Sequence, residues 1–147
     1  IGRLAGFDVI RVEGATGLYD TNYEGKADAC LDALADHDLI YLHVEAPDEA
    51  GHEGDVRLKV RCVEDFDRRL VGRLLRRVDL SETVIAVLPD HATPAHLRTH
   101  TAEPVPFLIR RPGQPPDSVE AFTEQSCARG SFGILAKDAF IRAVLAR

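Results

Sequence analysis

The chain has 147 residues, of which 45% are hydrophobic, and a formal net charge of −6. This length and composition suffice for one hydrophobic core, so we expect one domain. The acidic balance argues against a nucleic-acid partner, and no apolar run is long enough to span a bilayer. The three cysteines lie far apart without a C-x-x-C pair, which indicates reduced thiols in a cytoplasmic protein. Because no Met occurs even at position 1, we interpret the chain as a fragment of a longer protein.

The first predicted elements are a strand and a helix. Residues 7–12 alternate weakly between apolar and polar side chains, which indicates a short strand. Thr21 and Glu24 have the spacing of a capping box. We therefore expect a helix that begins at this pair and runs to about Asp36, with Cys30 on its apolar side.

A central strand is predicted over residues 38–44, which are apolar on both faces apart from His43. Such a run is typical of a parallel sheet covered by helices. The strand is expected to end in a Pro-containing loop that carries Asp48 and His52. After this loop, apolar residues at steps of three and four predict a long helix over residues 55–78. Its expected core stripe is Val56, Val60, Val63, Leu70, Leu74 and Val78.

The C-terminal half predicts two further strands and a helix. Residues 83–88 form a second central strand, and a polar loop leads to a strand at residues 105–109. The amphipathic residues 134–145 predict the last helix. Strands that alternate with helices indicate an α/β fold with a mostly parallel central sheet and helices on both faces.

Acidic and imidazole side chains follow the predicted strands. Asp48 and His52 follow the strand at 38–44, and Asp90 and His91 follow the strand at 83–88; His100 precedes the third strand. In open α/β sheets, ligands bind at the carboxyl ends of the strands. Asp and His together form an oxygen–nitrogen ligand set for Mn²⁺, Zn²⁺, Fe²⁺ or Co²⁺. Five candidates are too many for one tetrahedral site and too few to complete two, as expected of a fragment.

Alternative interpretations remain for the neighbouring polar residues. His43 is more consistent with a core histidine, or with a residue that supports the ligands, than with a ligand. His37 and His96 are expected at the surface. Glu45 and Glu49 flank the site, where they either hydrogen-bond ligating imidazoles or are solvated loop carboxylates.

Several stretches resemble the cofactor-independent phosphoglycerate mutases of the archaeal-type branch, which belong to the alkaline phosphatase superfamily. The matching stretches are residues 13–17, 21–26, 43–52, 64–67, 89–91, 98–101 and 104–107. They include His43-Val-Glu-Ala-Pro-Asp-Glu-Ala-Gly-His52 and Pro89-Asp-His91, and they occur in the order found in that family. The resemblance covers most of the first 110 residues.

The resemblance implies a role for each candidate ligand. Asp48, His52 and His100 are expected to hold one divalent ion. Asp90 and His91 are expected to hold a second, together with an Asp and the nucleophilic Ser that the family carries near its N-terminus. Mn²⁺ is expected first, with Zn²⁺, Mg²⁺ or Co²⁺ as alternatives, and one site is complete in this chain.

The implied reaction is the interconversion of 3-phosphoglycerate and 2-phosphoglycerate through a phosphoserine, in a larger protein of which this chain is the C-terminal part. No Ser or Thr here takes the nucleophile's place, so we expect the isolated chain to be inactive. Lys26 is a weak candidate for contact with a substrate phosphate. Alternatives are a related phosphatase or homoserine-kinase-like protein, or a metal-binding module without catalysis. Because an incomplete sheet leaves an open edge, a homodimer is also expected.

Overall fold

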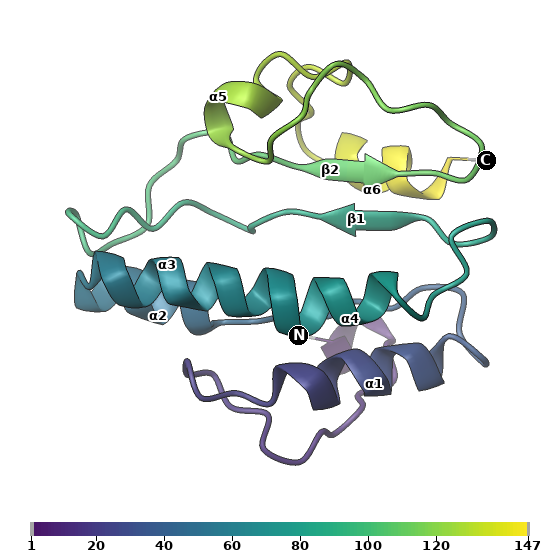
Figure 1. Cartoon of the computed structure of the whole chain (residues 1–147), viewed down its shortest axis with the longest axis horizontal. Helices are drawn as coiled ribbons and strands as arrows, with labels where there is room; N and C mark the ends of the chain where they lie inside the picture. Colours follow the sequence, from purple (N-terminus) through teal and green to yellow (C-terminus); the bar gives the residue numbers. More distant parts are fainter. Residues whose placement is uncertain (1, 147) are drawn as a thin grey trace. The chain divides into compact units, whose positions relative to one another are not determined.

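The computed structural model describes residues 2–146, which form two compact units. The first unit comprises the described residues up to Val78 together with Thr93–Thr99, and the second comprises Asp79–Ala92 and the described residues from His100 onward. The elements, labelled in Figure 1, are η1 (Gly2–Ala5), α1 (Tyr23–Ala33), α2 (Ala46–Glu53), α3 (Val56–Asp65), η2 (Phe66–Val71), α4 (Gly72–Leu75), β1 (Ile85–Val87), β2 (Leu108–Arg110), α5 (Glu124–Cys127) and α6 (Ala139–Leu145).

Helix α1 begins one residue later than a capping box at Thr21 predicts. Asn22 is the N-cap, and its side-chain oxygen accepts a hydrogen bond from the Gly25 N–H at 2.8 Å. The Thr21 hydroxyl instead accepts a hydrogen bond from the Thr16 N–H at 3.0 Å. Asn is at least as good an N-cap as Thr, so the helix begins at Asn22 rather than at the predicted Thr21. The helix ends at Ala33, short of the predicted Asp36.

The loop predicted to carry Asp48 and His52 is in fact the helix α2. Pro47 lies in the first turn of α2, where a missing N–H breaks no helical hydrogen bond. Gly54 ends the helix in the left-handed conformation, with φ of 77°. Because Asp48 and His52 are four residues apart on one helix, their side chains project from the same face.

The predicted helix over residues 55–78 is confirmed from Val56 to Leu75, three residues short of its predicted end, and it is not one regular α-helix. Asp55 caps it by accepting a hydrogen bond from the Leu58 N–H at 2.9 Å. The helical path then passes through the π-helical segment η2 into α4. The π-segment shifts the hydrogen bonding from i+4 to i+5, so it changes which side chains face the core. Val56, Val60 and Val63, which precede this segment and were predicted to be core residues, are more than half exposed, whereas Leu70 of the same predicted stripe is buried.

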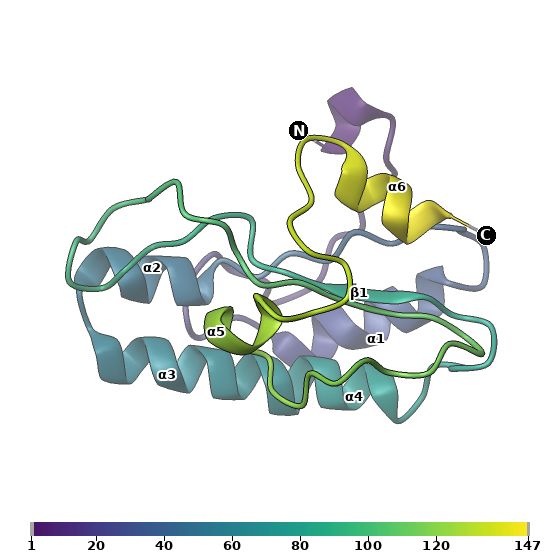
Figure 2. The ribbon, with the colours of Figure 1, turned by 90° about the horizontal axis from the view of Figure 1, so that it is seen from above.

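The hydrophobic core lies in the first unit. Its buried members are Tyr23, Ala27, Ala46, Ala50, Cys62 and Leu70. Figures 1 and 2 show α1 alongside the η2–α4 stretch and α2 alongside α3, in agreement with the contacts between these elements. Two ion pairs join α1 to the long helical path: Arg69 Nε lies 2.7 Å from a Glu24 oxygen, and Arg73 Nε lies 2.7 Å from an Asp28 oxygen. These guanidinium groups hold the pKa of both carboxyls below its usual range.

The second unit contains a two-stranded sheet. Strands β1 and β2 are antiparallel, with Ala86 opposite Ile109. The predicted strands at 83–88 and 105–109 therefore exist in shorter form, but this pair is not parallel. The segments 7–12 and 38–44 are not strands, because they lack ladder hydrogen bonds to a neighbouring strand within residues 2–146. The fold is α/β in the broad sense of helices combined with a small sheet.

The last predicted helix begins late. Helix α6 starts at Ala139, whereas the hydrophobic pattern predicts a start at residue 134. Gly133 and Lys137 have φ values of 61° and 57°, which an α-helix cannot contain. Phe107 packs between Phe132 and Phe140, with ring centroids 5.6 and 5.4 Å away, and this aromatic group anchors the C-terminal segment.

The three cysteines are free thiols, as the sequence predicts. Burial raises the pKa of the Cys30 and Cys62 thiols, so both are poor nucleophiles. Across the described part of the chain, no helix combines the length and the apolar character that crossing a membrane requires.

Candidate metal centre

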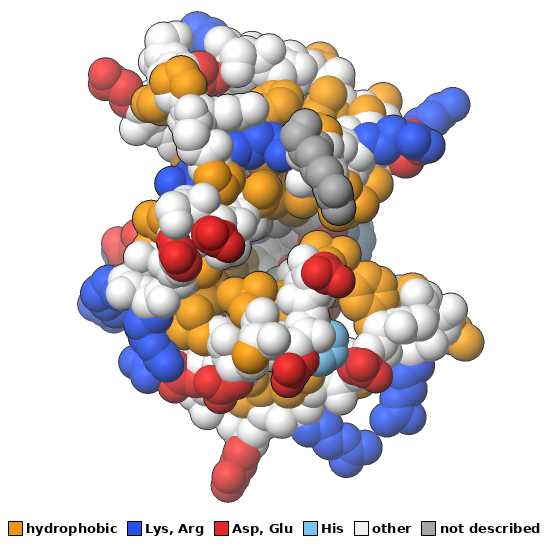
Figure 3. Space-filling model, turned by 90° about the vertical axis from the view of Figure 1, so that its right-hand side faces the viewer, with side chains coloured by type: hydrophobic (Ala, Val, Ile, Leu, Met, Phe, Trp, Pro, Cys, Tyr) orange, Lys and Arg blue, Asp and Glu red, His pale blue; other side chains and the backbone are white. Residues whose placement is uncertain are grey.

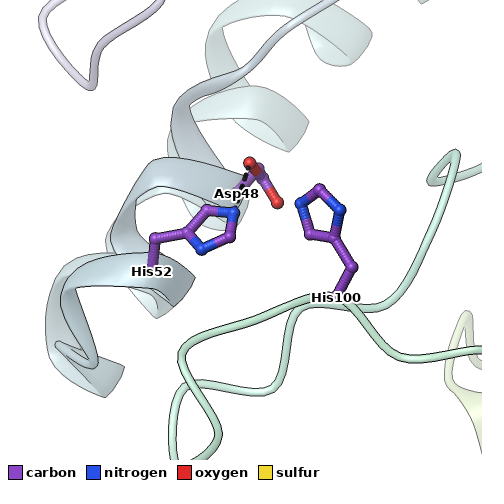
Figure 4. A group of neighbouring side chains, drawn as sticks. All are labelled: Asp48, His52 and His100. Atoms are coloured by element: carbon purple, nitrogen blue, oxygen red, sulfur yellow. Dashed lines mark ion pairs between the residues drawn. The ribbon is translucent and has the colours of Figure 1, made fainter.

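Asp48 and His52 lie side by side on α2. Asp48 Oδ2 is 3.3 Å from His52 Nε2, the contact that the dashed line marks in Figure 4. The side chains are 21% exposed for Asp48 and 37% exposed for His52, so both are accessible to a small ion. One carboxylate oxygen and one imidazole nitrogen thus converge at the surface of the first unit.

His52 is oriented by a backbone carbonyl. Its Nδ1 lies 3.0 Å from the carbonyl oxygen of Arg98, which also belongs to the first unit. A carbonyl only accepts, so Nδ1 carries the proton and donates it, and Nε2 keeps its lone pair in the neutral ring. Arg98 has a φ of 54°, an uncommon conformation for a non-glycine residue, and this bend occurs where the carbonyl meets His52.

Asp48 is oriented by a buried hydroxyl. Thr93 is 4% exposed, and its Oγ1 donates a hydrogen bond to Asp48 Oδ1 at 2.5 Å. The carbonyl of Thr93 in turn accepts a hydrogen bond from Lys59 Nζ at 2.5 Å. A Cβ on the buried Gly51 would come within 2.7 Å of the same carbonyl, so this close approach requires glycine.

Two further carboxylates lie beside Asp48. Glu45, Asp48 and Glu49 each offer an oxygen, and these oxygens lie within 4.8 Å of one another. Glu45 Oε2 also lies 3.4 Å from His43 Nδ1. The His43 side chain is 44% exposed, so the interpretation of His43 as a core histidine is wrong. His37 and His96 are exposed, as predicted. The clustered carboxylates make this end of α2 attractive to a cation.

Charge is mixed on one face of the surface. On the face drawn in Figure 3, acidic and basic side chains are interspersed among hydrophobic ones.

In the second unit, the predicted ligands lie on irregular segments. His91 Nε2 is 3.6 Å from Asp90 Oδ1, and the His91 and His100 rings have centroids 3.7 Å apart. An isolated bridge pairs Ala92 with Thr101, so it brings the residues beside His91 and His100 together. The structure thus unites His91 with His100, which the resemblance assigns to two different metal ions.

His100 is tied to the first unit by chain connectivity. It follows Arg98 by two residues, so their Cα atoms are at most about 7.6 Å apart. The carbonyl of Arg98, within the first unit, contacts His52. Figure 4 draws Asp48 and His52 on the helix and His100 on the loop. The joint assignment of these three residues to one ion stays a prediction.

Comparison with known proteins identifies the family. The model of the Metalloenzyme superfamily matches residues 1–141. The chain belongs to this superfamily. It is 52% identical over 138 residues to the 2,3-bisphosphoglycerate-independent phosphoglycerate mutase of Methanosarcina acetivorans, a match that covers 92% of this chain and 35% of that protein. The protein of the same name from Methanothrix thermoacetophila is 48% identical, with 99% of this chain and 38% of that protein covered.

A solved structure is also similar to this chain. A protein from Pyrococcus horikoshii matches with a TM-score of 0.86 and 41% identity, and the match covers 89% of this chain and 39% of that one. The chain therefore spans about a third of the length of the curated relatives it matches.

The α2 pair of this metalloenzyme fits a divalent metal ion. Carboxylate oxygen and imidazole nitrogen bind such ions at about 2.0–2.2 Å, so two ligand atoms at octahedral or tetrahedral angles lie about 2.8–3.6 Å apart. The observed separation of Asp48 Oδ2 and His52 Nε2, 3.3 Å, falls in this interval. With the proton of His52 on Nδ1, the donor set matches the chemistry of the superfamily.

Lys26 lies on α1, away from this pair in the sequence. Its ammonium donates a hydrogen bond to the carbonyl of His43 at 3.0 Å and lines a cavity of about 170 Å³ together with Cys30 and Tyr41. Burial lowers the pKa of Lys26, and the charge of Glu45 partly offsets this effect. Contact of Lys26 with a substrate phosphate stays a prediction.

Sequence reasoning missed the residues that orient the ligands. Thr93 stands two residues after His91 and before Pro94, but nothing in the pattern connects it to Asp48. Arg98 contributes a backbone carbonyl, which every residue has, so the residue type at this position does not predict the contact. The small Gly51, one residue before His52, is the one hint that another segment approaches α2 closely.

Proposed function

We propose that this chain is the C-terminal part of a binuclear metalloenzyme domain, and that the full-length protein interconverts 3-phosphoglycerate and 2-phosphoglycerate. The observation that carries the proposal is the convergence of Asp48 Oδ2 and His52 Nε2 at 3.3 Å, with His52 Nδ1 held by the Arg98 carbonyl. The family match and the names of the relatives support it.

Asp48, His52 and His100 would hold one ion, and Asp90 and His91 would hold the other together with ligands from outside this chain. Mn²⁺ is the first candidate, with Zn²⁺, Mg²⁺ and Co²⁺ as alternatives. Such ions lower the pKa of a bound hydroxyl and offset the charge of a transferring phosphoryl group.

Residues of this chain orient the two ligand side chains on α2. The Arg98 carbonyl keeps the His52 proton on Nδ1, so that Nε2 faces outward beside Asp48 Oδ2. The Thr93 hydroxyl donates a hydrogen bond to the other oxygen of Asp48, Oδ1. The nucleophilic Ser is expected outside this chain, and the substrate is a small phosphorylated hydroxy acid. Lys26 is a weak candidate for binding its phosphate. The proposal also includes a mostly parallel sheet in the complete domain. It further includes a cytoplasmic location and a homodimer.

The test is conversion of 3-phosphoglycerate to 2-phosphoglycerate by the full-length protein with added Mn²⁺. We expect activity in the native protein and no turnover by the 147-residue chain alone. In His52→Ala we expect a loss of activity of at least about 100-fold, because removing a metal ligand should cost more than the roughly 10–100-fold typical of losing a residue that only orients a ligand. Full activity of His52→Ala would contradict the proposal. Release of inorganic phosphate without isomerisation would favour a phosphatase, and Mn²⁺ binding without either reaction would favour a metal-binding module.

A further inference from the structure

Thr93 is buried beside the candidate metal centre, and neither the sequence pattern nor the resemblance gives it a role. We propose that Thr93 is a positioning residue that fixes the Asp48 carboxylate with Oδ2 directed toward the metal position. The inference rests on the proposed metal site at Asp48 and His52. It adds a residue that controls affinity without being a ligand.

The two oxygens of Asp48 have different neighbours. Oδ1 accepts the hydrogen bond of Thr93 at 2.5 Å, and Oδ2 lies 3.3 Å from His52 Nε2. An ionised carboxylate only accepts hydrogen bonds, so the hydroxyl of Thr93 is the donor. This bond fixes the rotation of the carboxylate about its last torsion, which is otherwise broad.

Thr93 is itself held on two sides. Lys59 of α3 donates a hydrogen bond to its carbonyl at 2.5 Å, and the same carbonyl packs so closely against Gly51 of α2 that a Cβ there would come within 2.7 Å of it. Thr93 is 4% exposed, so water does not compete well for its hydroxyl. The buried Thr93 side chain is thus fixed against the helix of Asp48 within the first unit.

A surface pair in the same unit provides a matched control. Thr16 Oγ1 donates a hydrogen bond to Asp20 Oδ1 at 2.9 Å, but both residues are exposed. The chemistry of the two Thr–Asp pairs is the same, and only the Thr93 pair holds a candidate ligand. Thr16→Val should therefore leave metal affinity unchanged.

The experiment is calorimetric titration of the chain with Mn²⁺, together with urea unfolding of each metal-free variant. Partners that orient a ligand typically change metal affinity 10–100-fold, so we expect Thr93→Val to weaken Mn²⁺ binding by about this factor. Thr93→Ser keeps the hydroxyl and should bind within about threefold of the native chain. Thr93→Ala removes the hydroxyl without adding bulk, and it should match Thr93→Val even if the valine variant folds poorly.

Three results would overturn the inference. Native-like affinity in both Thr93→Val and Thr93→Ala would show that the hydroxyl does not position Asp48. Equal weakening in Thr93→Ser would show that packing, rather than the hydrogen bond, sets the affinity. If the native chain binds no Mn²⁺ while its metal-free fold is intact, the proposed metal site itself fails, and the inference fails with it.

Discussion

The two units differ most in burial. All described residues that are buried belong to the first unit, where helices α1, α2 and α3 pack around Tyr23, Cys62 and Leu70. Among its described residues, the second unit has none in the buried class, and its sheet is two strands of three residues each. The first unit therefore carries its own core, whereas the second relies on partly buried contacts such as the Phe107 group.

This difference separates the candidate ligands. Asp48 and His52 stand on a helix whose Ala46 and Ala50 are buried, and hydrogen bonds within the same unit orient both side chains. Asp90, His91 and His100 stand on irregular segments of the second unit. Rigid elements hold ligands more accurately than loops. The α2 pair should thus keep its geometry without metal, and the other ligands should gain order when an ion binds.

The largest loss of stability is expected from a substitution in the core of the first unit. Leu70 is 2% exposed, so Leu70→Ala should lower the free energy of unfolding by about 2–5 kcal/mol. Ile109→Ala, in a half-buried position of β2, should cost only about 1 kcal/mol. Urea denaturation followed by circular dichroism measures both. Equal costs would contradict the difference between the units.

Gly51→Ala should disturb the contact between α2 and the Thr93 segment. The added Cβ would approach the Thr93 carbonyl to 2.7 Å, and overpacking of this kind costs about 1–3 kcal/mol. We also expect weaker Mn²⁺ binding, because Thr93 orients Asp48. Gly17→Ala is the control, since its Cβ would meet Glu45 only at an ordinary 3.9 Å. Thermal unfolding and metal titration of both variants test this, and a neutral Gly51→Ala would show that the contact is not tight.

How far the sequence predicts the structure depends on whether the signal is local. The long helix after Asp55 follows from its apolar steps and its cap. By contrast, strand pairing depends on neighbours distant in the sequence, so the segments at 7–12 and 38–44 were wrongly predicted as strands, and the pairing direction of β1 and β2 was not predictable. Helix α2 was missed because its eight residues have a weak apolar pattern, although Pro47 and Gly54 are typical end signals.

The same distinction applies to the candidate site. Asp48 and His52 are visible as a pair because helical spacing places them on one face. Their partners Thr93 and Arg98 contact them through side-chain and backbone hydrogen bonds across 45 and 46 residues of sequence. No periodicity connects positions so far apart, and a contact through a backbone carbonyl cannot be predicted from the residue type.

A smaller effect concerns the core of the first unit at high pH. The Tyr23 hydroxyl is buried and has no hydrogen-bond partner among residues 2–146, and burial raises the pKa of Tyr23 to about 12. The folded chain therefore holds this proton more tightly than the unfolded chain, whose Tyr ionises near its ordinary value of about 10. The corresponding stability is present below pH 10 and is lost as the pH rises toward 12.

Tyr23→Phe cannot ionise and should lose less stability across this window. At pH 7 the variant should be equal to the native chain or more stable by up to about 1 kcal/mol, because it removes an unsatisfied polar group. Urea unfolding at pH 7 and at intervals above pH 10 measures the difference. Parallel losses in both proteins would contradict the role of Tyr23.

The smallest expected effect concerns association through the second unit. The two-stranded sheet has unpaired edges among the described residues, and open edges favour pairing with another chain. We expect a weak dimer at high protein concentration, seen by light scattering. A strict monomer at every concentration would remove the sheet edge as an interface.

The preorganised pair at Asp48 and His52 is tested most directly by calorimetric titration of the chain with Mn²⁺, comparing the native chain, His52→Ala and His96→Ala. His96 is an exposed histidine of the same unit and is the matched control. We predict one strong site in the native chain and in His96→Ala, and binding at least about 100-fold weaker in His52→Ala, beyond the 10–100-fold cost of an outer partner. Native-like affinity in His52→Ala would contradict the account.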